Sequence, residues 1–208
     1  MPKRSKSSSR WLNEHESDPF VKAARAAGLR SRAAFKLEEI QQTDRVLRPG
    51  MTVVDLGAAP GGWCQIAVPL VGRKGRVIAT DILSMEPIDG VDFIQGDFSA
   101  DEVLGQLLAL LGPTKAQLVM SDMAPNMSGI ASVDHLRIMH LVELAMDFAE
   151  RSLAPQGDLL VKIFQGSELP GFVKRLRGRF DSVKVRKPKA SRNRSSEVYL
   201  LARNFRMV

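Results

Sequence analysis

The chain has 208 residues, of which 44% are hydrophobic, so one domain with a sizeable buried core is expected. No stretch approaches the roughly 20 apolar residues that a membrane-spanning helix needs, and the basic start MPKRSKSSSRW lacks the apolar segment of a secretory signal. The one cysteine, Cys64, excludes an internal disulfide and is typical of a reducing compartment, so a cytoplasmic protein that does not associate with membranes is expected.

The net charge of +7 is distributed unevenly along the chain. Residues 1–36 carry nine Lys/Arg and three Asp/Glu, and residues 172–208 carry twelve and two, whereas the middle of the chain is acidic. If the fold brings both ends together, they form a single basic face, which is typical of a protein that binds a polyanion. Nucleic acid is the first candidate partner and an acidic membrane surface is the second.

The predicted elements alternate along most of the chain. Residues 1–10 are rich in Ser, Lys and Arg and are expected to be disordered in the unbound protein. A helix is predicted over residues 31–45, where Ser31 can provide the N-cap. Strands are predicted at residues 52–56, 76–81, 92–95, 117–121, 158–164, 182–186 and 198–203. Helices are predicted at residues 63–71, 101–111, 133–152 and around 172–179, with a stop at residues 153–157.

This alternation predicts an α/β fold with a mostly parallel sheet. Near-continuous apolar runs such as Leu118-Val119-Met120 are typical of strands that are covered on both faces. In open sheets of this kind, the ligand binds beyond the carboxyl ends of the strands. Residues that directly follow the predicted strands are therefore the candidates for a functional site.

The segment DLGAAPGGW (residues 55–63) follows the first predicted strand. Gly57, Gly61 and Gly62 allow a tight turn and close approach of a ligand. A pyrophosphate needs free N–H groups and no nearby carboxylate, but Pro60 lacks an N–H and Asp55 adds negative charge. The pattern therefore disfavours a nicotinamide dinucleotide, and with it an oxidoreductase, and favours a cationic ligand without phosphate such as S-adenosylmethionine.

Two further acids follow the next two predicted strands. Asp81 can accept hydrogen bonds from both hydroxyls of a ribose, and Asp97 can accept one from an adenine amino group. An acid after a strand is often only a helix cap, but three of them at successive strand ends, beside a glycine-rich turn, favour a cofactor site. Trp63 either covers the methionine part of the ligand or packs the following helix.

The fourth and fifth predicted strands carry the candidate chemistry. Residues 121–129 (SDMAPNMSG) contain no aromatic side chain to stack on a flipped base, which favours a hydroxyl acceptor over a base amine. Lys162 interrupts the apolar fifth strand, and a buried ammonium must be paired or functional. It either forms a salt bridge or takes the proton from an attacking hydroxyl. Lys36 and Glu197, taken alone, are typical of surface residues.

Five segments together resemble the FtsJ family of ribose 2′-O-methyltransferases, and within it the bacterial members that act on large-subunit ribosomal RNA; they are residues 31–37, 55–63, 121–129, 161–166 and 191–199. The resemblance implies a Rossmann-like, S-adenosylmethionine-dependent methyltransferase fold, in which helices flank a mostly parallel seven-stranded sheet. It implies a catalytic tetrad of Lys36, Asp122, Lys162 and Glu197. It also implies S-adenosyl-L-methionine contacts at Gly61, Trp63, Asp81, Asp97 and Asp122, to which Asp55 and Gly57 of the same loop are added.

The same resemblance implies methyl transfer to the 2′-hydroxyl of a uridine ribose in 23S ribosomal RNA, within the large ribosomal subunit. Residues 1–30 would be a basic, partly disordered RNA-binding extension, and residues 31–208 a single methyltransferase domain. No metal is required, the three histidines are interpreted as structural or surface residues, and a monomer is expected. Transfer RNA is the alternative substrate, and a non-enzymatic RNA-binding ribosome-assembly factor is the alternative function.

The RNA surface is predicted to draw on basic side chains from both ends of the chain. These are Lys3, Arg4, Lys6, Arg10, Arg30, Arg32, Lys174, Arg175, Arg177, Arg186, Lys187, Lys189, Arg192 and Arg194. Phosphate contacts of this kind provide affinity but little sequence discrimination. The role of Lys162 stays open between a general base and a charged group that stabilises the developing alkoxide, and Asp122 is expected to orient it.

Overall fold

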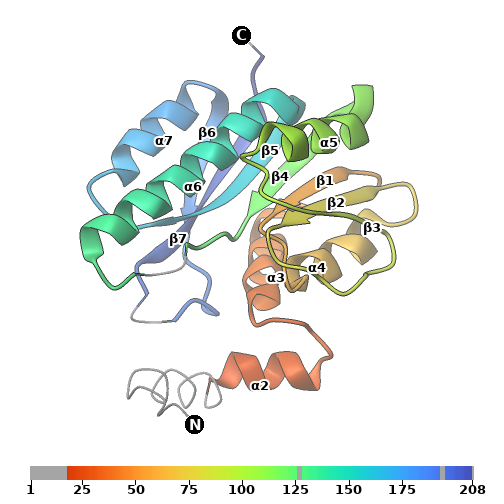
Figure 1. The fold of residues 1–208 in the computed structure, drawn as a ribbon, viewed down its shortest axis with the longest axis horizontal. Helices are drawn as coiled ribbons and strands as arrows, with labels where there is room; N and C mark the ends of the chain where they lie inside the picture. Colours follow the sequence, from red (N-terminus) through yellow and green to blue (C-terminus); the bar gives the residue numbers. More distant parts are fainter. Residues whose placement is uncertain (1–17, 126–127, 193–194, 208) are drawn as a thin grey trace.

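The computed structural model describes residues 18–125, 128–192 and 195–207, and its centre is one sheet of seven strands (Figure 1). The order across the sheet is β3-β2-β1-β4-β5-β7-β6. β1 to β5 run parallel, and β7 is antiparallel to both β5 and β6. The strands are β1 (Thr52–Leu56), β2 (Arg76–Asp81), β3 (Val91–Gln95), β4 (Ala116–Ser121), β5 (Leu153–Phe164), β6 (Phe180–Arg186) and β7 (Glu197–Phe205). The predicted α/β fold with a mostly parallel seven-stranded sheet is confirmed.

Helices cover both faces of this sheet (Figure 1). They are α2 (Pro19–Ala26), α3 (Ala33–Asp44), α4 (Gly62–Val71), α5 (Asp101–Leu111), α6 (Ala131–Ser152) and α7 (Leu169–Arg177). α5, α6 and α7 pack on one face, and α3 and α4 pack on the other. Neighbouring residues of β1 alternate between the two cores: Val53 belongs to the α3–α4 side and Val54 to the other. None of the described helices combines the length and apolar character that a membrane crossing requires.

One local prediction is wrong, and one strand begins earlier than predicted. Ser31 does not cap α3, which begins after Arg32 without any side-chain capping hydrogen bond. Ser31 packs on the start of α4 instead, since a Cβ atom on Gly62 would lie 2.2 Å from its Oγ atom. The predicted stop at residues 153–157 does end α6, but the chain enters β5 at once. Leu153 pairs with Ala116, and an irregularity in register follows before the regular pairing with β4 resumes.

Helix α2 was not predicted, although the sequence carries its start signal. Asp18 is the N-cap, and its Oδ1 atom accepts a hydrogen bond of 2.9 Å from the Phe20 backbone N–H. Pro19 takes the first helical position, where its missing N–H is harmless. α2 contacts α3 through Phe20 and Phe35, whose ring centroids are 5.8 Å apart. The disorder predicted for residues 1–10 concerns a segment outside the described residues.

The last residue of α3 fixes this helix to the antiparallel edge of the sheet. Asp44 accepts two hydrogen bonds from Arg186 on β6, of 2.6 Å from Nε and 2.7 Å from Nη2. Arg203 on β7 donates to the Asp44 backbone carbonyl at 3.0 Å. The hydrogen bond from Arg186 lowers the pKa of Asp44 below its ordinary value. These contacts set the position of α3, and of Lys36 on it, relative to β7.

We predict that Asp44→Asn lowers the free energy of unfolding at pH 7 by about 1–3 kcal/mol, because it weakens a largely buried bidentate ion pair. The pKa of Asp44 is lower in the folded than in the unfolded protein. Its contribution is therefore complete above the ordinary value of 3.8 and is lost as the pH falls through the lower folded value. Urea unfolding from pH 7 to pH 3 tests this; the difference between variant and wild type should narrow at the acidic end.

Asp147→Asn is the matched control, because Asp147 pairs with Arg175 at 2.5 Å but both side chains are well exposed. We expect a change within about 0.5 kcal/mol at every pH. Equal losses for the two variants at pH 7 would show that Asp44 is no stronger an anchor than a surface ion pair.

Candidate active site

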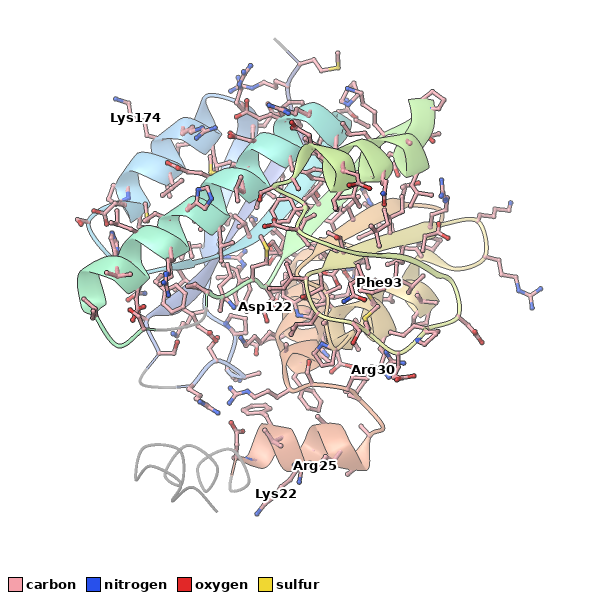
Figure 2. The ribbon with its side chains drawn as sticks, in the orientation of Figure 1. Lys22, Arg25, Arg30, Phe93, Asp122 and Lys174 are labelled. Atoms are coloured by element: carbon pink, nitrogen blue, oxygen red, sulfur yellow. The ribbon has the colours of Figure 1, made fainter. Side chains whose placement is uncertain are left out.

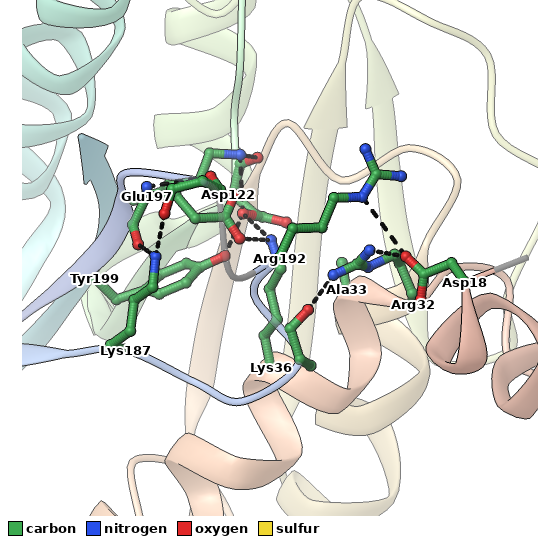
Figure 3. Close-up of polar contacts among 12 residues, drawn as sticks. Asp18, Arg32, Ala33, Lys36, Asp122, Lys187, Arg192, Glu197 and Tyr199 are labelled. Carbon is green, nitrogen blue, oxygen red and sulfur yellow. Dashed lines mark hydrogen bonds and ion pairs between the residues drawn. The ribbon is translucent and has the colours of Figure 1, made fainter. Parts of the chain in front are cut away.

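Four charged side chains meet at the carboxyl edge of the parallel strands (Figure 3). Lys36 comes from α3, Asp122 directly follows β4, Lys162 lies in β5 and Glu197 begins β7. Lys36 Nζ lies 2.9 Å from Glu197 Oε1, and Lys162 Nζ lies 3.0 Å from Asp122 Oδ1. Lys36 Nζ is also 3.7 Å from Asp122 Oδ1, which joins the two pairs. The structure therefore brings the predicted tetrad (Lys36, Asp122, Lys162 and Glu197) into one network.

Asp122 is the centre of this network. Its backbone carbonyl accepts a second hydrogen bond from Lys162, of 2.6 Å, and its Oδ1 atom accepts one from the Tyr199 hydroxyl, also of 2.6 Å. The Tyr199 ring lies 5.8 Å from the Trp63 ring and 5.6 Å from Lys36 Nζ, centroid distances that allow aromatic and cation–π contacts. Tyr199 was not predicted; the available signal was its place two residues after Glu197, on the same side of β7.

The tetrad is withdrawn from water, and its charges determine how its acids titrate. The Lys36 and Lys162 side chains are only 8% and 6% exposed. Burial raises the pKa of Asp122, but Lys162, Lys36 and the Tyr199 hydroxyl outweigh it, so the pKa lies below its ordinary value. Burial also raises the pKa of Glu197, but its partners, Lys36 foremost, together have the larger effect, so this pKa too lies below its ordinary value. Both acids are therefore carboxylates at neutral pH.

A first cavity, of about 460 Å³, lies where the strands β1, β2, β3 and β4 end. Asp81 stands in its wall, held by hydrogen bonds from the backbone N–H groups of Ala59 (2.9 Å) and Leu83 (2.8 Å). Asp97 is exposed on the wall, and its Oδ1 atom accepts from the Ser99 hydroxyl at 2.7 Å, which lowers its pKa. The remaining wall consists of Gly57, Ala59, Thr80, Ile82, Leu83, Gly96, Phe98, Asp122, Met123, Ala124, Pro125, Arg137, His140 and Leu141.

Sequence reasoning missed most of these wall residues. Ile82 and Leu83 follow Asp81 directly and are 62% and 63% exposed, which is unusual for large apolar side chains. Two exposed apolar residues after a strand-ending acid could have indicated a ring-binding wall. Met123 and the α6 residues Arg137 and His140 carried no comparable signal in the sequence.

A second, small cavity of about 140 Å³ lies beneath the glycine loop and shares Asp122 and Gly57 with the first. Gly57 has a φ of +77°, and a Cβ atom there would lie 2.2 Å from Met123 Cγ, so this position requires glycine. Trp63 lines the small cavity and donates its indole N–H to the Ala33 carbonyl at 2.8 Å, which ties the start of α4 to α3; its contact with the methionine part of a ligand stays a prediction. Gly61 has a φ of +105° and packs beside Met85 and Ile88; neither cavity wall includes it.

Asp55 departs from its predicted role as a carboxylate that adds negative charge to the loop. It is 1% exposed at the end of β1, and it borders the small cavity from below. Burial raises the pKa of Asp55 to about 7, although the Cys64 thiol donates to its Oδ2 atom at 3.2 Å; Asp122 and Asp81 nearby raise the pKa further. Asp55 is therefore neutral in much of the population at physiological pH.

A third cavity, of about 450 Å³, opens onto the tetrad from a basic wall. Lys36 and Glu197 belong both to the tetrad and to the wall of this cavity. The other wall residues are Arg32, Arg192 and Ser195. Lys187 donates to the Glu197 backbone carbonyl at 2.7 Å and thereby fixes the start of β7 (Figure 3). Three members of the tetrad border these cavities: Asp122 lies in the walls of the first two, and Lys36 and Glu197 lie in that of the third, whereas Lys162 lines none of the three.

The predicted basic face is present in part among the described residues, since Arg32 and Arg192, one from each end of the chain, share a cavity wall. Other basic side chains lie elsewhere. Lys174 on α7 lies far from Lys22 and Arg25 on α2, at the opposite end of the molecule (Figure 2). Arg30 is used internally, because its Nη2 atom donates to the Pro87 carbonyl at 2.8 Å, and Arg175 pairs with Asp147. Arg186 is held by Asp44, as described above. The predicted contributors Lys3, Arg4, Lys6, Arg10 and Arg194 lie outside the described residues.

The described residues contain no group of three or more His, Cys, Asp or Glu side chains that could hold a metal ion. His135 pairs with Glu168, with Nε2 and Oε2 2.9 Å apart, and His140 lies in the wall of the first cavity. The expectation that no metal takes part remains a prediction.

The sheet order, the antiparallel β7 and the cavities at the strand ends define the class: a Rossmann-like methyltransferase. Residues 29–205 match the FtsJ-like methyltransferase family, to which the chain belongs. A Plasmodium falciparum protein described as a ribosomal RNA methyltransferase is 32% identical; the match covers 85% of this chain and 98% of that one, with a TM-score of 0.77.

Two other solved structures share the fold alone. A Clostridium thermocellum protein described as an rRNA methylase is 18% identical, with a TM-score of 0.56 over 82% of this chain and 97% of that one. The methyltransferase MycE of the mycinamycin biosynthetic pathway, solved with Mg and SAH, is 14% identical, with a TM-score of 0.55 over 99% of this chain and 58% of that one.

We predict that Asp55→Asn changes the pH dependence of stability. The pKa of Asp55 is about 7 in the folded protein and near 3.8 in the unfolded chain, so the wild type loses stability as the pH rises from about 4 and carries the full penalty above about 7. The variant has no such penalty. Relative to the wild type, it should gain about 1–3 kcal/mol between pH 5 and pH 9 in urea unfolding.

The control is Asp92→Asn, whose acid lies on the surface and pairs with the exposed Arg76. The stability of this variant should follow that of the wild type across the same pH range. A parallel pH dependence for Asp55→Asn and the wild type would mean that Asp55 is ionised in the folded protein throughout.

Proposed function

We propose that this protein transfers the methyl group of S-adenosylmethionine to the 2′-hydroxyl of a ribose, that of a uridine in the 23S RNA of the large ribosomal subunit. The observation that carries the proposal is the position of the tetrad between two cavities of different character. Asp122 borders the cavity with the ribose-binding acid Asp81, and Lys36 borders the cavity with the arginines. A donor and an acceptor placed in these two cavities would meet at the tetrad, where Lys162 is paired with Asp122.

The residues of the first cavity fit S-adenosylmethionine. Asp81 is held by two backbone N–H groups, so its carboxylate is oriented to accept from ribose hydroxyls, and Ile82 and Leu83 offer apolar surfaces to the adenine ring. The loop N–H groups that a pyrophosphate would need are already used: those of Gly57, Ala58 and Gly61 donate to backbone carbonyls and that of Ala59 donates to Asp81, while Pro60 has none. When bound, the cofactor supplies a methyl group that its sulfonium already activates. The SAH complex of MycE, which has the same fold, supports this choice.

Lys162 is suited to remove the proton from the attacking hydroxyl once it has released its own extra proton to solvent; as an ammonium, it would stabilise the developing alkoxide instead. A neutral lysine amine has two N–H bonds, and the carboxylate and the carbonyl of Asp122 accept both, which leaves the nitrogen lone pair for the incoming proton. Asp122 in turn is held by the Tyr199 hydroxyl and stays ionised. Lys36 and Glu197 neutralise each other and border the acceptor cavity, where they hold the ribose. Burial of these groups excludes water and preserves their alignment.

Two observations support RNA as the acceptor. The loop after β4 has Met123, Ala124 and Pro125 where an enzyme acting on base amines needs an aromatic stacking surface, so a hydroxyl acceptor fits better. The acceptor cavity carries Arg32 and Arg192, which can bind the phosphate groups next to a ribose. The Plasmodium falciparum protein, described as a ribosomal RNA methyltransferase, shares the family. A monomeric cytoplasmic enzyme remains our expectation.

We predict that Lys162→Met abolishes methyl transfer while the protein still folds. Loss of a general base lowers the rate by about 10²- to 10⁴-fold, and methionine fills most of the same buried space. The measurement uses labelled S-adenosylmethionine with ribosomal RNA, large subunits and transfer RNA from a methylation-deficient strain. Calorimetric titration with the cofactor and circular dichroism verify that the donor site and the fold persist. Wild-type activity should be greatest on ribosomal RNA or subunits.

Lys74→Met is the control, because Lys74 is exposed in the turn before β2 and lines neither cavity; its activity should equal that of the wild type. Transfer by Lys162→Met at the wild-type rate would remove Lys162 from the chemistry. Transfer by the wild type to transfer RNA alone would select the alternative substrate. Binding of ribosomal RNA without any transfer would favour an assembly factor.

A further inference from the structure

Two arginines from distant parts of the chain hold the carboxylate of Asp18 (Figure 3). Its Oδ2 atom forms an ion pair with Arg32 Nη1, just before α3, and lies 3.6 Å from Arg192 Nε, in the loop before β7. The Asp18 and Arg32 side chains are 9% and 15% exposed. The N-cap of α2 is thus joined to residues that are close to it only in the folded protein.

The same two arginines form the basic wall of the acceptor cavity, in which Lys36 and Glu197 face the tetrad. Their guanidinium groups are therefore shared between an internal carboxylate and a cavity that the proposed function assigns to RNA. Guanidinium groups bind carboxylates and phosphates through the same pairs of N–H donors. A phosphate at this wall would compete directly with Asp18.

We propose that Arg32 and Arg192 bind the phosphate next to the acceptor ribose, and that Asp18 occupies these arginines until RNA displaces it. The inference rests on the proposed function. In RNA, the 3′-phosphate is carried by the carbon atom next to the one that bears the 2′-hydroxyl. A ribose that presents its hydroxyl to Lys162 therefore brings a phosphate into the same cavity, and the exchange replaces one anion with another, so neither arginine loses its counterion.

The surroundings of Arg32 allow this exchange. Its Nη2 atom donates to the Ala190 carbonyl, and the guanidinium carbon lies 5.9 Å from the centre of the Phe20 ring. Arg32 is therefore held in place by contacts that do not involve Asp18. Arg192 is bound less firmly, with a 29% exposed side chain and a 3.6 Å separation from the acid, so it can turn toward a phosphate.

The test is the affinity of Asp18→Asn for a short, fluorescein-labelled single-stranded RNA, measured by anisotropy without the methyl donor. Asparagine caps a helix as well as aspartate does, so α2 is retained, which circular dichroism verifies. We expect the variant to bind about 3- to 10-fold more tightly, because the competing carboxylate is gone. Asp181→Asn is the matched control: it also removes an acid that pairs with an arginine, Arg206 at 3.7 Å, but on the exposed part of β6. It should bind within about twofold of the wild type.

A double-mutant cycle with Arg192→Gln locates the effect. If part of the gain depends on this arginine, Asp18→Asn should add less affinity in the Arg192→Gln background, where only Arg32 is left to be released. Equal affinities of Asp18→Asn and Asp181→Asn, or an undiminished gain in the Arg192→Gln background, would overturn the proposal. Methyl transfer is measured separately. If Asp18→Asn binds RNA more tightly but the wild type transfers no methyl group to any RNA, the proposed function is refuted and the phosphate site stands.

Discussion

Two ammonium groups and two carboxylates are buried together at the carboxyl ends of the parallel strands, and their mutual neutralisation is the constraint on which the site depends. An unpaired charge in such a place is strongly disfavoured, so each group needs a partner from another element. Lys36 on α3 pairs with Glu197 on β7, and Lys162 on β5 pairs with Asp122 after β4. The bond between Asp44 and Arg186 keeps α3 where the first of these pairs can form.

The network also decides which groups can move a proton. Asp122 accepts hydrogen bonds from Tyr199 and Lys162 on one oxygen atom and remains ionised, so it orients the lysine without competing for its proton. Asp55 lies on the neighbouring strand β1 and is buried without a cationic partner, so its pKa rises to about 7. The contrast shows that partners, more than depth, determine the charge of an acid at this edge of the sheet.

Much of the fold and of the site could be predicted from the sequence, because hydrophobic runs and strand-end acids are local signals. The strand-end residues Asp81 and Asp122 and the buried Lys162 lie where the pattern places them. Tyr199, α2 and the split of the basic face could not be predicted with the same reasoning, since they depend on which distant residues meet. In the sequence, the basic ends of the chain offer Arg30, Arg175 and Arg186 as free charges. Only the folded chain shows that carbonyls and acids within the protein hold these arginines.

The central claim is that the methyl group reaches a ribose oxygen in RNA. The most direct test is mass spectrometry of nucleosides from ribosomal RNA of a methylation-deficient strain, after incubation with the protein and isotopically labelled S-adenosylmethionine. The account predicts the label on the ribose of one nucleoside, with the adjoining phosphodiester bond resistant to alkali because its 2′-hydroxyl is blocked. Label on a base, with the bond still alkali-sensitive, would contradict it.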